Sequence, residues 1–401
     1  MATISTRCCI TGGGPAGMML GLLLARAGID VVVLEKHGDF LRDFRGDTVH
    51  PSTLQVMHEL GLLDAFLKLP HSEVRSIGAQ IGESLYAIAD FSHLPTRCRF
   101  VAFMPQWDFL DFLAAEAKRF AGFHLMMRTE ATGLIRDGER VAGVTAHGPD
   151  GQVDIRAELV VATDGRHSTL RDAAGFAVVD RGAPMDVLWL RLSKQQTDPG
   201  QTLGRVDAGR IFIMLDRNDY WQCAFVIPKG GIEAVHARGL DAFRGEIERL
   251  APFLRGRTQE LATWDDVKLL TVAVNRLNTW FRPGLLCIGD AAHAMSPVGG
   301  VGINLAIQDA VAAANILVTP LREGGVTLDH LRAVQRRREP PTRKTQRLQV
   351  AIQNRVIGNV LSRTTTPKAP FAVRLLGWFP VLRRLPARII GMGFRPEHIR
   401  H

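Results

Sequence analysis

The 401-residue chain is poor in cysteine, and it lacks both metal-ligand spacing among its cysteines and a nucleic-acid recognition motif. An odd number of cysteines, mostly in apolar runs and without metal-ligand spacing, predicts buried thiols in a reducing compartment and no bound metal. The five are Cys8, Cys9, Cys98, Cys223 and Cys287. No nucleic-acid recognition motif accompanies the formal net charge of +9, so we expect no nucleic-acid partner.

Acidic residues are scarce toward the C-terminus. Residues 321–401 contain 17 lysines and arginines but only four acids. This basic excess indicates either solvated helix faces or a surface for anionic ligands or a membrane. The tail over residues 371–394 mixes apolar residues with arginines, but its longest uncharged run is far shorter than the roughly 20 residues of a transmembrane helix. We expect the tail to pack against the nucleotide domain, with weak contact to a membrane surface as the alternative.

A glycine-rich turn follows the first apolar stretch. Residues 7–10 predict a strand, and Gly12, Gly14 and Gly17 come next in the spacing G-x-G-x-x-G. A helix to about residue 27 and a second strand ending at Glu35 complete the unit. The glycines allow a tight turn, approach of a pyrophosphate and close helix packing, while the acid is placed for ribose hydroxyls. The unit predicts a dinucleotide site, to which we also assign Pro15, Ala16 and Lys36.

Only one such fingerprint is found in the sequence. A protein that binds NAD(P) and FAD in separate Rossmann domains would usually show two, so we interpret this one as the site of a tightly held FAD. The apolar run over residues 18–24 imitates a signal peptide, but cleavage after it would remove the glycine turn. We therefore expect an uncleaved, cytoplasmic protein.

A second glycine-rich loop lies between residues 289 and 304. It follows the apolar run 285–288 and leads into an alanine-rich segment, so the expected order is buried strand, loop and helix. Asp290, just past the strand, is placed to accept hydrogen bonds from ligand hydroxyls. Gly299, Gly300 and Gly302 leave bare backbone at the helix N-terminus, where unpaired N–H groups suit an anion or a carbonyl that gains negative charge.

The chain between these loops predicts mainly β-structure. Strand patterns fill residues 72–103 and 180–280, and a buried strand over residues 159–163 leads directly to Asp164 and Gly165, a position that favours a functional turn. Four tryptophans lie in the block 180–280 and are expected to belong mostly to a core; they are Trp189, Trp221, Trp264 and Trp280. Residues 328–356 predict a basic helix interrupted at Pro340 and Pro341.

Together, these stretches resemble the FAD-dependent aromatic hydroxylases typified by para-hydroxybenzoate hydroxylase, which are class A flavoprotein monooxygenases. The likeness is carried by the first glycine turn with Glu35, by Asp164-Gly165, and by the loop from Gly289 to Asn304. Its order and spacing cover residues 1 to about 345. The segment Arg336-Arg337-Arg338-Glu339-Pro340 is also similar to the Arg-Arg-x-Pro segment of the family.

The resemblance implies an α/β fold, in which a Rossmann-like FAD-binding domain carries an inserted β-sheet substrate domain and a C-terminal helical region. It places the FAD-binding domain at residues 1–71, 104–179 and 281–345. Substrate-domain strands are expected at 72–103, the substrate-binding sheet at 180–280 and a basic helical extension at 346–401.

The resemblance also implies roles for single residues. Asp290 would bind the ribityl chain, Glu35 the adenosine ribose, and the glycines of the first turn the pyrophosphate region. Asp164 would lie at the FAD and NAD(P)H region, and the helix near Gly302 would direct its positive end at the flavin. Pro297 and Arg45 are the candidate catalytic residues, and the further cofactor contacts are Gln106, Gly300, Gly302, Ile303 and Asn304. The local sequence Met104-Pro105-Gln106 lacks an arginine that many members have there.

Members of this family use NADPH or NADH with O2 and hydroxylate an aromatic ring through a C4a-hydroperoxyflavin. The resemblance thus implies a monooxygenase for an aromatic or polyketide-like molecule, acting as a monomer or homodimer. A flavin reductase or dehydrogenase of the same fold, a membrane-peripheral quinone-precursor hydroxylase and an FAD-holding binding module remain alternatives. His71, His93 and Tyr220 are unranked candidates for a base, whereas His293 is expected to be structural or near the flavin.

Overall fold

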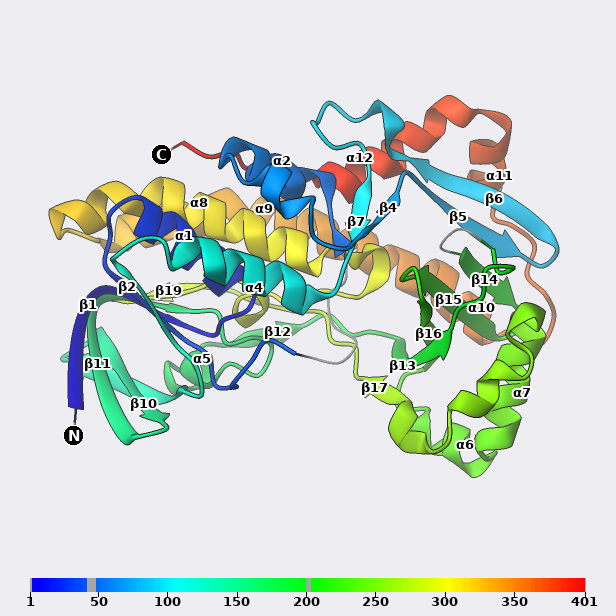
Figure 1. The fold of residues 1–401 in the computed structure, drawn as a ribbon, viewed down its shortest axis with the longest axis horizontal. Coiled ribbons are helices and arrows are strands. Elements are labelled where there is room, and N and C mark those ends of the chain that lie inside the picture. The colour runs from blue at the N-terminus through cyan, green and yellow to red at the C-terminus, as the bar shows by residue number, and fades with distance from the viewer. Residues whose placement is uncertain (1, 42–47, 200–202, 401) are drawn as a thin grey trace.

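The computed structural model describes residues 2–41, 48–199 and 203–400 (Figure 1). Its centre is an eight-stranded sheet in which β19, β20, β11, β1, β2 and β8 lie side by side in that order. The pairs from β20 to β8 are all parallel. The strands are β1 (Ala2–Thr11), β2 (Val31–Leu34), β8 (Phe123–Met126), β11 (Gly151–Ala162), β19 (Phe281–Arg282) and β20 (Leu285–Cys287). In addition, β10 (Arg140–Gly148) pairs antiparallel with β11, and β9 (Glu130–Asp137) pairs antiparallel with β10.

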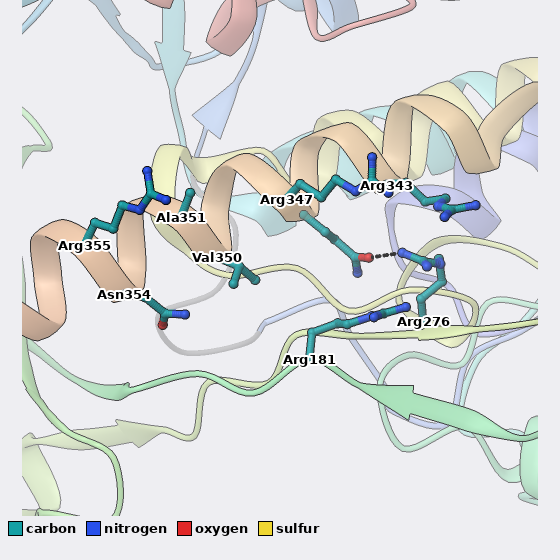
Figure 2. Close-up of a pocket in the computed structure, with 9 residues that line it drawn as sticks. Arg181, Arg276, Arg343, Arg347, Val350, Ala351, Asn354 and Arg355 are labelled. Carbon is teal, nitrogen blue, oxygen red and sulfur yellow. Dashed lines mark hydrogen bonds between the residues drawn. The ribbon is translucent and has the colours of Figure 1, made fainter. Parts of the chain in front are cut away.

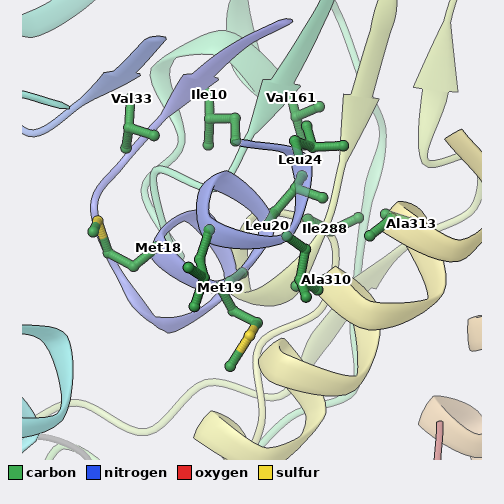
Figure 3. Packing of buried hydrophobic residues seen from close by; sticks show 14 of the residues in the cluster. Ile10, Met18, Met19, Leu20, Leu24, Val33, Val161, Ile288, Ala310 and Ala313 are labelled. Atoms are coloured by element: carbon green, nitrogen blue, oxygen red, sulfur yellow. The ribbon is translucent and has the colours of Figure 1, made fainter. Parts of the chain in front are cut away.

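Four helices cover one face of this sheet (Figure 1). They are α1 (Pro15–Arg26), α4 (Gln106–Ala117), α8 (Gly302–Glu323) and α9 (Leu328–Ile352). Helix α1 is packed between the strands and α8, with Leu20 and Leu24 among buried strand residues and α8 alanines (Figure 3). Burial of each such leucine stabilises the fold by roughly 1.5–3 kcal/mol. The small side chains of Ala310 and Ala313 let the two helices lie close together.

A second, seven-stranded sheet has the order β17, β13, β16, β15, β14, β5 and β6. Its pairs are antiparallel except for β14 with β5. Helix α7 (Leu240–Leu250) packs on one face, where Phe212, Trp221 and Phe243 are buried together. The strands are β5 (Ser76–Ile81), β6 (Ser84–Asp90), β13 (Met185–Ser193), β14 (Leu203–Asp207), β15 (Arg210–Asp216), β16 (Tyr220–Pro228) and β17 (Lys268–Leu270).

Smaller elements connect the two sheets. Strands β3 (Thr48–Val49), β4 (Ser72–Val74) and β7 (Val101–Phe103) form a third sheet, and β12 (Val178–Asp180) pairs with β18 (Asn275–Leu277). The expected α/β fold, with a Rossmann-like sheet, an antiparallel second sheet and C-terminal helices, is confirmed. Within the block 180–280, where strand patterns were expected, residues 267–274 form only the short edge strand β17, because the chain then leaves the sheet to reach β18.

Helix α9 corrects one expectation, since it continues through Pro340 and Pro341. Proline inside a helix removes a backbone hydrogen bond and costs about 3 kcal/mol. Here the flanking residues are anchored strongly enough to offset that cost: Arg338 is fully buried and ion-paired, and Pro341 is buried against the core. Tertiary contacts therefore override the local sequence signal.

The C-terminal tail is docked on the rest of the protein. Helices α11 (Phe371–Trp378) and α12 (Arg384–Met392) lie against β6, and α12 also meets α2 (Pro51–Glu59). Ala387 and Met392 of α12 are buried with Phe91 and Phe103 in a shared apolar cluster. Beyond α12, the carboxylate of Glu397 is buried and pairs with Arg337 and Arg338 of α9.

One helical segment of the described residues, Val298–Glu323, is long and apolar enough to cross a membrane. Because 83% of its apolar window is buried inside the protein, it is a core helix. The five cysteines are also buried, and none forms a disulfide.

Candidate functional site

The sequence motifs meet at one edge of the central sheet. Strands β20, β11, β1 and β2 are neighbours and run parallel, so their carboxyl ends lie together. The segments that leave these four ends carry Asp290, Asp164, the first glycine turn and Glu35, respectively. In open α/β sheets, ligands bind outside the carboxyl ends of the strands. This edge is therefore the candidate cofactor site.

Each glycine of the first turn has a distinct steric role. Gly12 has φ +100°, and a Cβ there would lie 2.5 Å from the carbonyl oxygen of Thr163. A Cβ on Gly17 would lie 2.0 Å from the carbonyl oxygen of Gly12, so both positions require glycine for packing alone. A Cβ on Gly14 would meet nothing within 4 Å. The open space at Gly14 is where a ligand can approach the backbone.

The N-terminus of α1 presents unpaired donors beside that space. Gly14 is the N-cap and Pro15 and Ala16 begin the helix, but no side chain caps it and its first turn holds no acid. Unpaired N–H groups and the helix dipole favour an anion at this point. Glu35 lies next to the turn, where its two carboxylate oxygens accept hydrogen bonds from the backbone N–H groups of Gly13 and His37, each at 3.0 Å.

Asp290 occupies a short 3-10 turn directly after β20. One of its carboxylate oxygens lies 3.6 Å from Nη2 of Arg166, and both side chains are partly exposed. Arg166 also reaches the carbonyl oxygen of Thr271 at 3.4 Å. Asp290 is thus held by one cation and still faces solvent, an arrangement that leaves its oxygens accessible to ligand hydroxyls.

Asp164 is engaged inside its own loop. Its carboxylate accepts hydrogen bonds from the Ser168 hydroxyl at 2.5 Å and from the Leu170 N–H at 3.3 Å, which fixes the start of α5 (Thr169–Ala173). Burial raises the pKa of Asp164, although these hydrogen bonds act in the opposite direction. Thr163, the preceding residue, donates to the carbonyl oxygens of Thr11 and Gly12 and so joins the Asp-Gly turn to the glycine turn.

The second glycine loop is fixed from two sides. The Thr48 hydroxyl donates to the carbonyl oxygen of Gly300 at 2.9 Å, and Gly300 has φ +63° with no room for a Cβ beside Thr48. Asn304, in the first turn of α8, accepts hydrogen bonds from the hydroxyls of Ser52 and Thr53, both at 2.7 Å. Helix α2 therefore sets the position of the first turn of α8.

The N-terminus of α8 itself is uncapped by any side chain. Its N-cap is Val301, and no acid lies in the first turn, which starts at Gly302 and Ile303. A Cβ on Gly302 would meet nothing within 4 Å. Pro297 opens the 3-10 turn that leads to this helix. The loop thus offers a second positive helix end with open space next to it.

A buried ionic network holds this loop in place. Asp309 of α8 accepts hydrogen bonds from the Gly289 N–H at 3.1 Å and from Nε of Arg338 at 2.9 Å, and its Oδ2 lies 2.6 Å from Nε2 of His293. Burial would raise the pKa of Asp309, but His293 and Arg338 outweigh burial, and the pKa is lowered. Asp309 is thus ionised and fixes the loop that carries Asp290. His293 is buried and lies against this carboxylate.

The remaining candidates are spread more widely. Lys36 is exposed and lies 3.7 Å from Glu130, and Gln106 begins α4. Arg45 lies outside the described residues. Among the possible bases, Nδ1 of His71 lies 2.7 Å from the Leu69 carbonyl oxygen, and His93 lies 3.9 Å from Asp90 on the surface. Tyr220 has the guanidinium of Arg191 over its ring at 3.9 Å.

Several supporting residues escaped the sequence interpretation. Thr48, Ser52 and Thr53 precede or begin a helix, and Arg166 follows the Asp-Gly turn, but their partners lie far away in sequence. Asp309 also went unnoticed. Asp309 lies seven residues after Gly302, two turns into the helix. The one available signal in the sequence was an acidic residue within a mainly apolar segment.

The residues present fit FAD. Open backbone at Gly14, the uncapped starts of α1 and α8, and two acids at strand ends provide donors for phosphates and acceptors for hydroxyls along one edge. In the described parts of the chain, no group of three or more His, Cys, Asp or Glu side chains could hold a metal ion. The donors and acceptors along this edge suit an organic dinucleotide.

Comparisons with known proteins agree with this geometry. The sequence model of a family described as FAD binding domain matches residues 5–347. A 6-methylpretetramide 4-monooxygenase from Streptomyces rimosus is 33% identical over 386 residues, which cover 95% of this chain and 92% of that protein. A 12-dehydrotetracycline 5-monooxygenase/anhydrotetracycline 6-monooxygenase from the same species is 29% identical and covers 75% of this chain and 60% of that protein.

Solved structures share the fold. A p-nitrophenol 4-monooxygenase from Pseudomonas putida has a TM-score of 0.77 at 20% identity, covering 97% of this chain and 96% of that chain. An anhydrotetracycline hydroxylase from Streptomyces rimosus has a TM-score of 0.74 at 21% identity, covering 97% and 76%. At such identities the likeness concerns the architecture alone.

Proposed function

Because this chain belongs to the FAD-dependent class A flavoprotein monooxygenases, we propose that it hydroxylates an aromatic or polyketide-like small molecule with NAD(P)H and O2. The observation that carries the proposal is the convergence of four motif-bearing strand ends on one sheet edge, flanked by two uncapped helix N-termini. The relative that is similar along most of its length supports the substrate class, since its name gives 6-methylpretetramide as the compound it oxygenates.

Bound FAD would supply the redox chemistry that couples NAD(P)H oxidation to insertion of one oxygen atom of O2. The chain's own task at the phosphate end is electrostatic. The N–H groups at the start of α1 would donate to the pyrophosphate region in the open space at Gly14, and Gly12 and Gly17 keep the turn compact. Glu35, already oriented by two backbone N–H groups, accepts from the adenosine ribose hydroxyls.

Asp290 orients the cofactor between its two ends. Its carboxylate would accept hydrogen bonds from the ribityl hydroxyls, while the ion pair with Arg166 holds the carboxylate in place. Asp309 and His293 keep the loop of Asp290 from shifting. Because a misplacement of about 1 Å can cost a hundredfold in rate, such support of the loop matters for catalysis.

The start of α8 acts at the reacting end of the cofactor. Its unpaired N–H groups and positive dipole stabilise negative charge near Gly302 and Ile303. Pro297 shapes the same loop, and the hydrogen bonds from Thr48 and from Ser52 and Thr53 to Asn304 hold it rigid. Arg45 completes the proposed set of catalytic and cofactor residues.

The substrate would lie against the seven-stranded sheet, which faces this loop through an apolar cluster of Met185, Ile211 and Val226 with Val298. An apolar cluster packed against this loop would help to exclude water from the reacting atoms. The protein is proposed to act in the cytoplasm as a monomer or homodimer.

The C-terminal tail suggests a location within the cytoplasm. Phe371, Trp378, Phe379, Val381 and Leu385 are each more than half exposed. Arginines alternate with them, and residues 364–396 contain no acid. We propose that this surface, called here the tail surface, makes weak contact with anionic membranes.

The proposed activity is tested with purified protein. A yellow protein that oxidises NAD(P)H faster with one aromatic or polyketide compound, and yields that compound heavier by one oxygen atom, would support a monooxygenase. A yellow protein that reduces its flavin but forms no oxygenated product would instead be a reductase or dehydrogenase. A yellow protein that does not oxidise NAD(P)H would be a binding module, and failure to bind FAD would refute the whole proposal.

A further inference from the structure

A solvent-open cavity of about 510 Å³ lies between α9 and the β12–β18 pair. Its volume falls within the range of small-molecule sites, roughly 300–1,000 Å³. Arg343 and Arg347 of α9 line one side together with Arg355 of the π-helical turn that follows α9 (Gln353–Ile357), and Arg181 and Arg276 line the opposite side (Figure 2). None of these residues belongs to the cofactor edge described above.

The cavity carries a large excess of positive charge. Glu339 is the one acid that pairs with any of the five arginines in the described structure, at 3.7 Å from Arg343 and 3.9 Å from Arg276. Within the same described residues, the guanidinium groups of Arg181, Arg347 and Arg355 have no hydrogen-bond or ion-pair partner. Charges of one sign repel each other, so an anion bound among these arginines would stabilise the arrangement.

Arg276 shows that this is more than a solvated helix face. Its side chain is only 8% exposed, and its Nη1 donates to Oε1 of Gln346 at 2.7 Å. Gln346 is itself fixed, because its amide group donates to the carbonyl oxygens of Asn275 and Ala294. Burial and the neighbouring arginines lower the pKa of Arg276. A buried, pre-oriented guanidinium at the wall of a cavity is typical of a binding site rather than of a surface.

The cavity also adjoins the second glycine loop. Two glutamines near these arginines hold that loop. Gln349 of α9 bonds both the N–H and the carbonyl oxygen of Ser296, and Gln353, directly after α9, donates to the Ser296 hydroxyl. Gln346 touches Arg276 on one side and the Ala294 carbonyl on the other. A ligand bound to the arginines would therefore lie next to the glutamines that hold the loop that carries Pro297.

We propose that this cavity binds the phosphate group of a small-molecule ligand. Guanidinium groups match phosphate because their planar forks donate two parallel hydrogen bonds. One source of that phosphate is the 2′-phosphate of NADPH, a reading that rests on the proposed function and would make the site a selector of NADPH over NADH. The other source is a separate phosphorylated metabolite.

The test uses the full-length, FAD-loaded protein and two probes, adenosine 2′,5′-bisphosphate and inorganic phosphate. Calorimetric titration compares the natural protein with a variant carrying Arg181→Gln and Arg347→Gln. The control is Lys344→Gln, which removes a positive charge from an exposed position of the same helix that does not line the cavity. Flavin absorbance and Tm establish that each variant is folded.

We expect the double variant to bind adenosine 2′,5′-bisphosphate about tenfold or more weakly, and the control to bind it unchanged. If the phosphate comes from NADPH, KM for NADPH rises by a similar factor, while KM for NADH and kcat stay constant. If the two KM values keep their ratio but phosphate binding still depends on the arginines, the site serves another phosphorylated ligand. Equal binding of both probes by all three proteins would overturn the proposal. The titration needs no substrate turnover, so it stands even if the monooxygenase activity fails.

Discussion

Nε2 of His293 lies 2.6 Å from Oδ2 of Asp309, and both side chains are buried, at 1% and 0% exposure. The same oxygen accepts the N–H of Gly289, the residue before Asp290, and the other oxygen of Asp309 accepts from Arg338. Arg338 in turn pairs with Glu397 near the C-terminus. One carboxylate thus connects the Asp290 loop, α8, α9 and the tail.

We expect Asp309→Asn to lower the free energy of unfolding by about 3–5 kcal/mol, because it removes from the buried cation of Arg338 the nearer of its two carboxylate partners, Asp309 and Glu397. Urea denaturation measures the change. Asp329→Asn is the matched control, since Asp329 is 83% exposed and pairs with Arg332 on the surface of α9, a contact worth about 1 kcal/mol or less. Equal losses in the two variants would contradict the central role of Asp309.

The glycines of the first turn have two different roles, packing and ligand binding, which substitutions can distinguish. Gly12→Ala and Gly17→Ala place a Cβ within 2.5 Å of a backbone oxygen, so we expect both variants to be strongly destabilised. Gly14 has φ −73° and open space, so Gly14→Ala should fold with a nearly unchanged Tm. Its affinity for FAD should nevertheless fall about tenfold or more, because the methyl group occupies the approach of the pyrophosphate. Fluorescence titration of the apoprotein with FAD measures this, and undiminished affinity would place the pyrophosphate elsewhere.

The stability of the second sheet at acidic pH depends on the carboxylate of Asp198. Burial opposes ionisation of its carboxylate, but two hydrogen bonds from Arg257 at 2.6 and 2.7 Å and one from Trp221 hold its pKa at about 2. A depressed carboxyl pKa stabilises the fold above the ordinary pKa, and this stabilisation is lost as the pH falls toward 2. We expect roughly 2 kcal/mol to disappear between about pH 5 and pH 2.

Comparison of the natural protein with Asp198→Asn tests this expectation. The variant should be less stable at pH 7, and the difference between the two proteins should shrink as the pH falls through that window. A difference that stays constant from pH 7 to pH 3 would show that Asp198 does not titrate as described.

The tail surface predicts weak, charge-dependent binding to membranes. A variant with Phe371→Ser and Trp378→Ser should float less with vesicles that contain anionic lipid, whereas Leu269→Ser, at an exposed position on β17, should behave like the natural protein. Truncation after Thr365 would be a poorer test, because it also removes the buried Glu397. Recovery of the natural protein entirely in solution with such vesicles would refute membrane contact.

The sequence predicted the candidate site best where functional residues lie close together in the chain. Gly12, Gly14 and Gly17 lie within six residues, and covalent geometry alone brings them together at the end of β1. The meeting of this turn with Asp164 and Asp290 was also predictable, because each follows a strand of one parallel sheet. Periodicity likewise located the strands around Leu188 and Phe225.

Contacts between distant segments were not predictable. Thr48 bonds Gly300 across 252 residues, and Arg181 faces Arg347 across a cavity that no local pattern describes. The break expected at Pro340 was wrong for a related reason, since the contacts of Arg338 with Asp309 and Glu397 come from elsewhere in the chain. Such pairings follow from tertiary packing and require the three-dimensional structure.

The most direct test of the account is mass spectrometry of the product formed by the FAD-loaded protein from NADPH, O2 and a panel of aromatic and polyketide compounds, with ¹⁸O2 as the oxygen source. The account predicts one compound that accelerates NADPH oxidation and gains a single ¹⁸O atom from O2. NADPH oxidation that yields only hydrogen peroxide with every compound, or label that enters from water instead, would contradict a monooxygenase.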